Sequence, residues 1–136
     1  MNYTEAFSFL GYSLESIRAD WSAEKPDGVC ITIRNAQIVP KSYPPRIDLW
    51  QLHADGGEFV NKPGYIKRTC HLSRAVSDFG GRIDVILVDG DLEEPYKDAH
   101  PWDCKKRKAS WMISKFDPES GYFCAEVVPH EEEPCL

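Results

Sequence analysis

The fold is decided by the stretch from Asn61 to Val88, which reads NKPGYIKRTCHLSRAVSDFGGRIDVILV. Its first part predicts a helix over Asn61–Phe79, because a proline lies in the first turn and two glycines follow the last one. Its second part, Arg82–Val88, is rich in β-branched residues and predicts an interior strand that is covered on both faces. A helix packed on a buried strand is therefore the centre of the expected domain.

The side chains of this helix divide into two stripes at helical spacing. The stripe expected to be buried consists of Tyr65, Thr69, Leu72, Val76 and Phe79. The opposite stripe is mainly basic and is expected to face solvent, and its members are Lys67, His71, Arg74 and Asp78, with Arg68 beside them. Such a stripe can grip phosphates, although the plain alternative is the solvated face of an amphipathic helix.

Further strands are expected on both sides of this unit. Val29–Val39 is rich in β-branched residues, and Ala109–Phe116 and Gly121–Val128 flank a turn as the two arms of a hairpin. Helices and strands do not alternate strictly, which favours an α+β fold over a doubly wound α/β fold. We predict one α+β domain over residues 1–128, with a mixed or curled β-sheet and one main packed helix, followed by an acidic, mobile tail at 129–136. The expected core contains Ile31, Ile33, Leu72, Val76, Val85, Leu87, Ile113 and Phe123.

The composition is that of a globular protein. The chain has 136 residues, of which 42% are hydrophobic and 28% are charged, and this suits a single folded domain. No apolar run approaches the roughly 20 residues of a membrane span, and the first residues lack the basic start of a signal peptide. Five cysteines without a C-x-x-C pair indicate reduced thiols. We therefore expect a cytoplasmic protein with no membrane partner.

The net charge is −6, from 16 basic and 22 acidic residues, which argues against a general binder of polyanions. Basic residues nevertheless cluster in the helix stripe and in a second run, Lys105, Lys106, Arg107 and Lys108. Basic residues near Trp111 suit a nucleic acid, although lysines at a strand edge also protect that edge from aggregation. If the protein binds nucleic acid, the two clusters are expected on one side of the molecule, with Trp102 or Trp50 near their centre.

Four tryptophans are many for this length. We expect Trp21, Trp50 and Trp102 to wall a ligand pocket, because aromatic faces stack on bases and cations. The alternative is that these rings pack loops on the sheet.

No motif of an enzyme or a metal site is recognised. The chain lacks a P-loop, a G-x-G-x-x-G and a G-x-S-x-G motif. The acidic segment Asp89–Glu94 does not match an EF-hand, and His100–Cys104 lacks the paired ligand spacing of a zinc site. We therefore predict no catalytic residue, no metal and no cofactor. Asp84 lies inside the buried strand and is expected to pair with an arginine, because a lone buried carboxylate is costly.

The segment Gly81–Glu126 resembles part of the PUA-like superfamily, in its EVE and YTH branches. The resemblance lies in the apolar strand Arg82–Val88, the acidic loop that leads to Pro101-Trp102, and the following run Ser110–Phe116. It implies a small curled β-barrel that reads a modified or flipped base in an aromatic pocket. The chain as a whole also resembles small uncharacterised bacterial proteins of mobile elements.

These features favour a small, soluble, non-catalytic binding protein, which we expect to read nucleic acid or a modified base. Two alternatives from other classes stay open at this point. One is a protein–protein interaction module, or a homodimer built on an exposed edge strand. The other is a protein that binds a small ligand, or an enzyme whose site carries no recognised motif.

Overall fold

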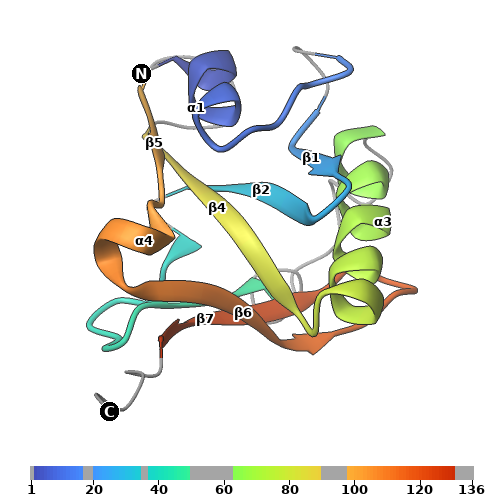
Figure 1. Ribbon diagram of the computed structural model, residues 1–136. Helices are drawn as coiled ribbons and strands as arrows, with labels where there is room; N and C mark the ends of the chain where they lie inside the picture. Colours follow the sequence, from blue (N-terminus) through green and yellow to red (C-terminus); the bar gives the residue numbers. More distant parts are fainter. Residues whose placement is uncertain (1, 17–19, 35–36, 50–62, 90–97, 131–136) are drawn as a thin grey trace, which may run out of the picture.

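The computed structural model describes residues 2–16, 20–34, 37–49, 63–89 and 98–130. These residues form the predicted α+β domain, with a mixed sheet and one long helix (Figure 1). In chain order the elements are α1 (Tyr3–Phe9), β1 (Ser22–Lys25), β2 (Gly28–Arg34), β3 (Arg46–Asp48), α3 (Pro63–Asp78), β4 (Arg82–Asp89), β5 (Asp98–Pro101), α4 (Cys104–Arg107), β6 (Ala109–Phe116) and β7 (Phe123–Pro129).

The sheet has the strand order β1-β2-β4-β6-β7-β3, and β5 pairs with β4 outside this path. β2 and β4 run parallel, with Cys30 opposite Asp84, whereas the other pairs are antiparallel. The four predicted strands therefore share one sheet, as expected. Among the described residues this sheet is open, so the closed barrel implied by the PUA-like resemblance is not formed.

Two clusters of buried side chains lie on opposite faces of the sheet. The larger cluster contains Leu72 and Ala75 of α3 together with Val85 of β4. The smaller cluster contains Phe7 of α1 together with Ile86 of β4. Because neighbouring side chains of a strand point to opposite faces, β4 contributes to both clusters, and this confirms the prediction of a strand covered on both sides.

The buried face of α3 differs from the predicted one by a rotation about the helix axis. Gly64, Tyr65, Arg68, His71, Leu72 and Ala75 are buried. Val76, expected in the core, is 45% exposed, whereas Arg68 and His71, expected in solvent, are 4% and 6% exposed. The physical reason is that His71 meets Ser22 of β1 and Arg68 meets aromatic rings, so this flank of the helix packs inward. Ile31, Ile33, Val85 and Phe123 are buried as expected, and Leu87 and Ile113 are partly buried.

Two element boundaries differ from the prediction. β2 ends at Arg34, and Gln37–Val39 instead begin a hairpin, in which Ile38 bridges Ile47 and the Val39 amide donates to the Arg46 carbonyl. The strand β3 was therefore missed. The fold also continues past residue 128, because the His130 amide donates to the Lys108 carbonyl. Among the helices that the structure describes, none is long and apolar enough to cross a membrane.

Gly121 provides a direct test of how closely the β6–β7 turn approaches α3. Its φ is +78°, and a Cβ there would lie 2.4 Å from Thr69 Oγ1 and 2.7 Å from the Tyr65 ring. We expect Gly121→Ala to destabilise the protein by about 2–4 kcal/mol, from backbone strain and overpacking together.

Gly80→Ala is the matched control for this prediction, because φ at Gly80 is +62° and nothing lies within 4 Å of a built Cβ. In this variant backbone strain alone should lower the free energy of unfolding, by about 1–2 kcal/mol as measured by urea denaturation. An equal loss of unfolding free energy in the two variants would show that the β6–β7 turn does not pack closely against α3.

Candidate anion-binding site

Arg68 lies in the second turn of α3 and is 4% exposed. Its guanidinium makes no hydrogen bond and no ion pair with any residue that the structure describes, and its Nε atom is enclosed without an acceptor. The other enclosed side-chain nitrogen without a partner in the described ranges is Trp111 Nε1, which belongs to a neutral ring in the main core. Arg68 is therefore a buried cation without a counter-charge among the residues that the structure describes.

Three aromatic rings surround this guanidinium, and we call them the aromatic box: Trp21, Tyr65 and Phe123. The Arg68 Cζ atom lies 5.4 Å from the Trp21 ring centroid, 5.1 Å from that of Tyr65 and 5.4 Å from that of Phe123. Trp21 and Tyr65 also meet edge to face, with centroids 6.2 Å apart. The faces of such rings attract a cation, but they do not accept the strong hydrogen bonds that a guanidinium donates.

Hydrogen bonds with the backbone fix two of the three residues of the aromatic box, Trp21 and Tyr65. The Trp21 carbonyl accepts from both the amide and the hydroxyl of Thr32 in β2, at 3.0 Å each. The Tyr65 hydroxyl donates to the Ser120 carbonyl at 2.5 Å, next to Gly121, where an added Cβ would meet the same ring. The box is thus assembled from the entry to β1, from α3 and from the start of β7.

Burial lowers the pKa of Arg68 to about 10 against the opposing influence of Tyr65, and the like charge of Arg34 lowers it further. The side chain therefore keeps its charge at neutral pH. Burying an unpaired ion costs several kcal/mol, and a desolvated cation–π contact offsets about 2 kcal/mol or more of that cost without supplying a hydrogen-bond acceptor. The N–H groups of the Arg68 guanidinium still lack a hydrogen-bond acceptor among the described residues, and an anion would supply both an acceptor and a counter-charge.

The other predicted cations of α3 are already neutralised. Lys67 Nζ lies 3.0 Å from Asp20 Oδ2 and 3.1 Å from Glu15 Oε2. Arg74 pairs with Glu24 at 3.1 Å and also donates to the backbone carbonyls of Lys25 and Pro26. These side chains hold α3 to the segment around β1, so they do not form the exposed stripe expected to grip phosphates.

His71, the remaining member of the predicted stripe, is bound to β1. Its Nδ1 atom lies 2.6 Å from Ser22 Oγ, and its Nε2 atom lies 3.9 Å from Glu24 Oε2. Burial lowers the pKa of His71, which favours the neutral ring. The order serine–histidine–carboxylate resembles a catalytic triad, but Ser22 is fully buried and cannot meet a substrate. This group therefore joins β1 to α3.

The predicted tryptophan pocket is not formed by the described residues. Trp102 is buried, donates from Nε1 to the Ala109 carbonyl at 2.9 Å, and packs against Trp111 with centroids 5.6 Å apart. The Arg107 guanidinium lies over the Trp102 ring, with its Cζ atom 4.2 Å from the ring centroid. Trp21 belongs instead to the aromatic box, and Trp50 lies outside the described residues.

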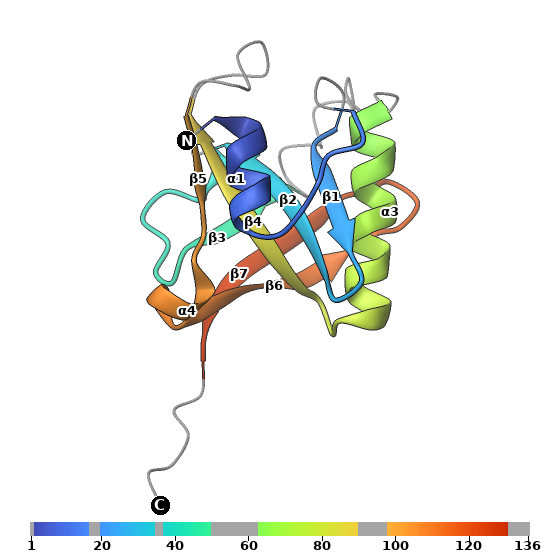
Figure 2. The same cartoon turned by 45° about the horizontal axis from the view of Figure 1, so that its top comes forward.

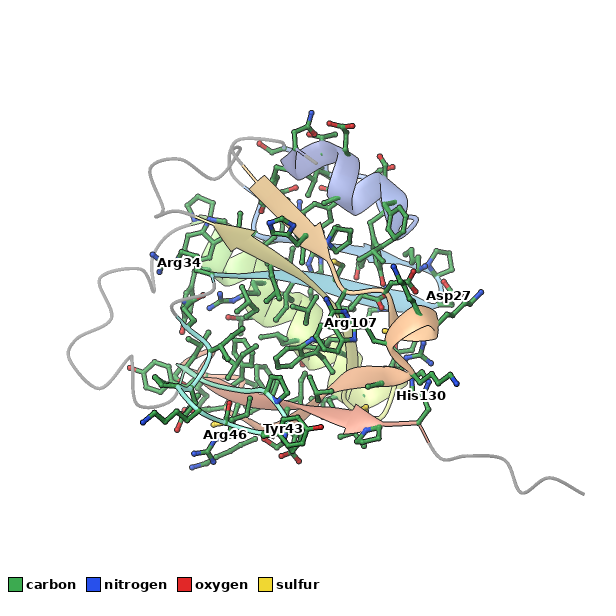
Figure 3. All side chains as sticks on the ribbon, turned by 90° about the vertical axis from the view of Figure 1, so that its left-hand side faces the viewer. Asp27, Arg34, Tyr43, Arg46, Arg107 and His130 are labelled. Atoms are coloured by element: carbon green, nitrogen blue, oxygen red, sulfur yellow. The ribbon has the colours of Figure 1, made fainter. Side chains whose placement is uncertain are left out.

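The two predicted basic clusters lie on different sides of the molecule. In Figures 1 and 2, α3 stands at one side of the sheet and α4 at the other, and in Figure 3 α4 lies in front with α3 behind. The expectation of one continuous basic groove is therefore wrong. Lys105, Lys106 and Lys108 are exposed, and no ion pair is formed by them within the described part of the chain.

Asp84 forms a second polar cluster, on the α1 side of β4. The Tyr12 hydroxyl donates to Asp84 Oδ2 at 2.6 Å, so the expected arginine partner is replaced by a tyrosine. The Cys104 thiol lies 3.9 Å from Oδ1, and burial raises its pKa, which disfavours the reactive thiolate. A cavity of about 460 Å³ lined by Lys25, Arg82 and Asp84 adjoins this cluster. Because both cations and carboxylates line it, the cavity favours neither an anionic nor a cationic ligand.

Within the described ranges, no three His, Cys, Asp or Glu side chains are grouped to hold a metal ion. The acidic residues Asp91–Glu94 fall outside those ranges. Comparison with known proteins adds no assignment: no protein-family model matches the chain, and no curated protein or solved structure is significantly similar to it. The PUA-like resemblance and the likeness to mobile-element proteins stay predictions.

Sequence reasoning missed two walls of this site. Tyr65 and Arg68 stand three residues apart on a helix, and this spacing places them side by side, so the pair was a signal that could have been used. Phe123 is 55 residues further along the chain from Arg68, and only the packing of β7 brings it to α3.

Arg68→Met tests whether the buried charge is unpaired in the folded protein. Methionine keeps much of the volume and removes the uncompensated charge, so we expect the free energy of unfolding to rise by about 1–3 kcal/mol at neutral pH. Arg74→Met, which removes a paired arginine, should lower the same free energy by about 1 kcal/mol. If Arg68→Met lowers the free energy of unfolding as much as Arg74→Met does, Arg68 has a stabilising partner in the folded protein.

Proposed function

We propose that the protein is a non-catalytic binding protein whose ligand is a small anion, held by Arg68 inside the aromatic box. The observation that carries this proposal is the buried guanidinium without a hydrogen-bond acceptor or counter-charge among the described residues. A position of this kind is expensive for the protein alone and becomes favourable when an anion occupies it.

The chemistry of the surroundings supports an anion over other ligands. The rings of Trp21, Tyr65 and Phe123 shield the guanidinium from water, and hydrogen bonds to an ionised ligand are stronger in such a setting. A cationic ligand would be repelled by Arg68. A neutral apolar ligand would leave the N–H donors unsatisfied, and that loss costs about 1–3 kcal/mol.

Binding is favoured over catalysis by the groups that line the box. Aromatic carbon faces offer neither a nucleophile nor a proton acceptor, and the hydroxyl of Tyr65 is engaged with the Ser120 carbonyl. Burial also raises the pKa of Tyr65, which keeps this phenol protonated at neutral pH. The side chains around Arg68 are therefore suited to enclosing a charge.

The experiment is a titration of the wild-type protein with phosphate, sulfate, acetate and a nucleoside monophosphate, each against chloride at constant ionic strength. At least one anion should raise the unfolding temperature, because a ligand at 100 times its Kd stabilises the folded state by about 2.7 kcal/mol. Arg68→Met should weaken that binding by about 100-fold or more, equivalent to about 2.7 kcal/mol.

Arg82→Gln is the control, because it removes an exposed arginine at the start of β4, outside the aromatic box, and gives the same change in net charge. It should bind the anion as the wild-type protein does. The proposal fails if none of the anions binds, or if Arg68→Met binds as tightly as the control.

Nucleic acid remains a second candidate ligand, through a surface different from the predicted one. Lys105, Lys106 and Lys108 around α4 are exposed and make no ion pair with described residues. Figure 3 shows Tyr43 and Arg46 of the β3 hairpin on the same side of the molecule as Arg107. Tyr43 is 98% exposed, and an exposed ring beside cations favours contact with a single-stranded nucleic acid.

A labelled single-stranded oligonucleotide tests this surface at about 50 and 200 mM salt, where affinity should fall about 10-fold or more across the range. Lys105→Gln with Lys106→Gln should weaken binding at the lower salt by about 3- to 10-fold, whereas Lys67→Gln with Arg74→Gln should not. Absence of binding at the lower salt would remove this candidate. The protein–protein and homodimer alternatives stay predictions.

A further inference from the structure

The cavity beside Asp84 lies at the end of the sheet where β2 and β4 begin. Its volume is about 460 Å³, within the range of about 300–1,000 Å³ that is usual for ligand pockets. Its lining comes from the β1–β2 turn, from Phe79 just after α3 and from the first residues of β4. None of the three rings of the aromatic box lines it, so this cavity is a second and separate candidate site.

Four of the lining residues surround Tyr12 on the α1 face of the sheet. Arg82 and Asp84 are two residues apart on β4, so they point to the same face, and Asp84 meets the Tyr12 hydroxyl there. Lys25 of β1 reaches the same ring, with its Nζ atom 4.7 Å from the Tyr12 ring centroid. A Cβ built on Gly28 would lie 2.4 Å from the Tyr12 hydroxyl oxygen. Strand alternation and the contacts therefore agree on the face that these residues share.

Two of the charges in the lining compensate each other. Lys25 Nζ donates to the Leu10 carbonyl at 3.1 Å and lies 3.9 Å from Asp27 Oδ1. Asp27, labelled beside the start of β2 in Figure 3, has a side chain that is 85% exposed. This pair leaves little net charge for a ligand.

Arg82 and Asp84 are the charges of the cavity without an ionic partner among the described residues. The half-buried Asp84 accepts from the Tyr12 hydroxyl at 2.6 Å through Oδ2, while the Cys104 thiol lies 3.9 Å from Oδ1. Both of these groups are neutral donors. Arg82 is exposed, and its guanidinium forms no ion pair with any described residue, Asp84 included. The cavity thus has an inner carboxylate and an outer guanidinium that do not neutralise each other.

We propose that this cavity binds a free α-amino acid with an apolar side chain, its ammonium group on Asp84 and its carboxylate on Arg82. The two residues are about 6.6 Å apart along β4, because each residue advances a strand by about 3.3 Å. One carbon atom joins the ammonium nitrogen of an amino acid to its carboxylate carbon, so the ligand spans this gap with a hydrogen bond at each end. Both hydrogen bonds are charge-assisted, and the planar donors of an arginine match a carboxylate.

A ligand with both charges fits this lining better than a ligand with one. A simple anion is attracted by Arg82 but repelled by Asp84, and the reverse holds for a simple amine. Acetate and phosphate therefore bind weakly here, so Arg82→Gln remains a valid control for the anion site at Arg68. Val29, Phe79 and Ile83 supply the apolar part of the lining, against which an aliphatic or aromatic side chain can pack.

The test is calorimetric titration of the wild-type protein at pH about 7 with L-leucine and L-phenylalanine. At least one of them should bind. Two analogues of each amino acid keep its side chain and lose one charge. They are 3-methylbutylamine and 4-methylpentanoate for leucine, and phenethylamine and 3-phenylpropanoate for phenylalanine. Each analogue should bind about 10- to 100-fold more weakly than its amino acid, because one charge-assisted hydrogen bond is lost.

Variants assign the two ends of the ligand. Arg82→Gln should weaken amino-acid binding by about 10-fold or more and change binding of the matching amine by less than about 3-fold. Asp84→Asn keeps an acceptor for Tyr12 and should weaken binding of both the amino acid and the amine by about 10-fold or more. Lys41→Gln is the control, because it removes one positive charge from an exposed residue outside the cavity and should bind the amino acid as the wild-type protein does.

Three outcomes would overturn the inference. They are the absence of binding by both amino acids, an amine or acid analogue that binds as tightly as its amino acid, and an Arg82→Gln protein that binds the amino acid like Lys41→Gln. Arg82 is exposed, so its substitution tests the site even if Asp84→Asn does not fold. None of these outcomes bears on the aromatic box, whose test uses simple anions and Arg68→Met.

Discussion

Strand β4 is the element on which the rest of the structure depends, because it is paired along both edges and covered on both faces. β2 runs parallel to it on one side, while β6 and β5 share its other side. α3 must then cover one face, and Leu72 and Ala75 fill the core there. Arg68 precedes Leu72 by four residues, so the same helical stripe carries its charge inward.

That stripe explains why the candidate site exists. A leucine or methionine at residue 68 would suit the packing, since the position lies between Tyr65 and Leu72 on the buried face of α3. An arginine there is enclosed by three rings and lacks a described counter-charge. Proteins keep such costly groups where binding needs them, so the loss of stability at Arg68 is matched by the gain in binding that we propose.

The sequence predicted the parts of this fold that depend on local pattern. The strand at Arg82–Asp89 and the helix at Pro63–Asp78 follow from β-branched runs, glycines and a proline, and both are present. The orientation of α3 could not be settled by pattern, because stripes through Thr69 and Val76 or through Arg68 and Ala75 fit the same spacing. Tertiary partners decided it, since Ser22 meets His71 and the box receives Arg68. The position of α4 opposite α3 likewise depends on long-range pairing of β6.

The most direct measurement is the nuclear magnetic resonance signal of the Arg68 Nε–Hε group, assigned by its absence in Arg68→Met. In the ligand-free protein we expect the Arg68 Hε to exchange slowly with water, because Nε is enclosed. Its signal should lie at the upfield position of a group without an acceptor. Addition of an anion that binds should move this signal downfield in proportion to occupancy. A downfield signal already present in the free protein, and unchanged by every anion tested, would show that Arg68 has a permanent partner within the protein and binds no anion.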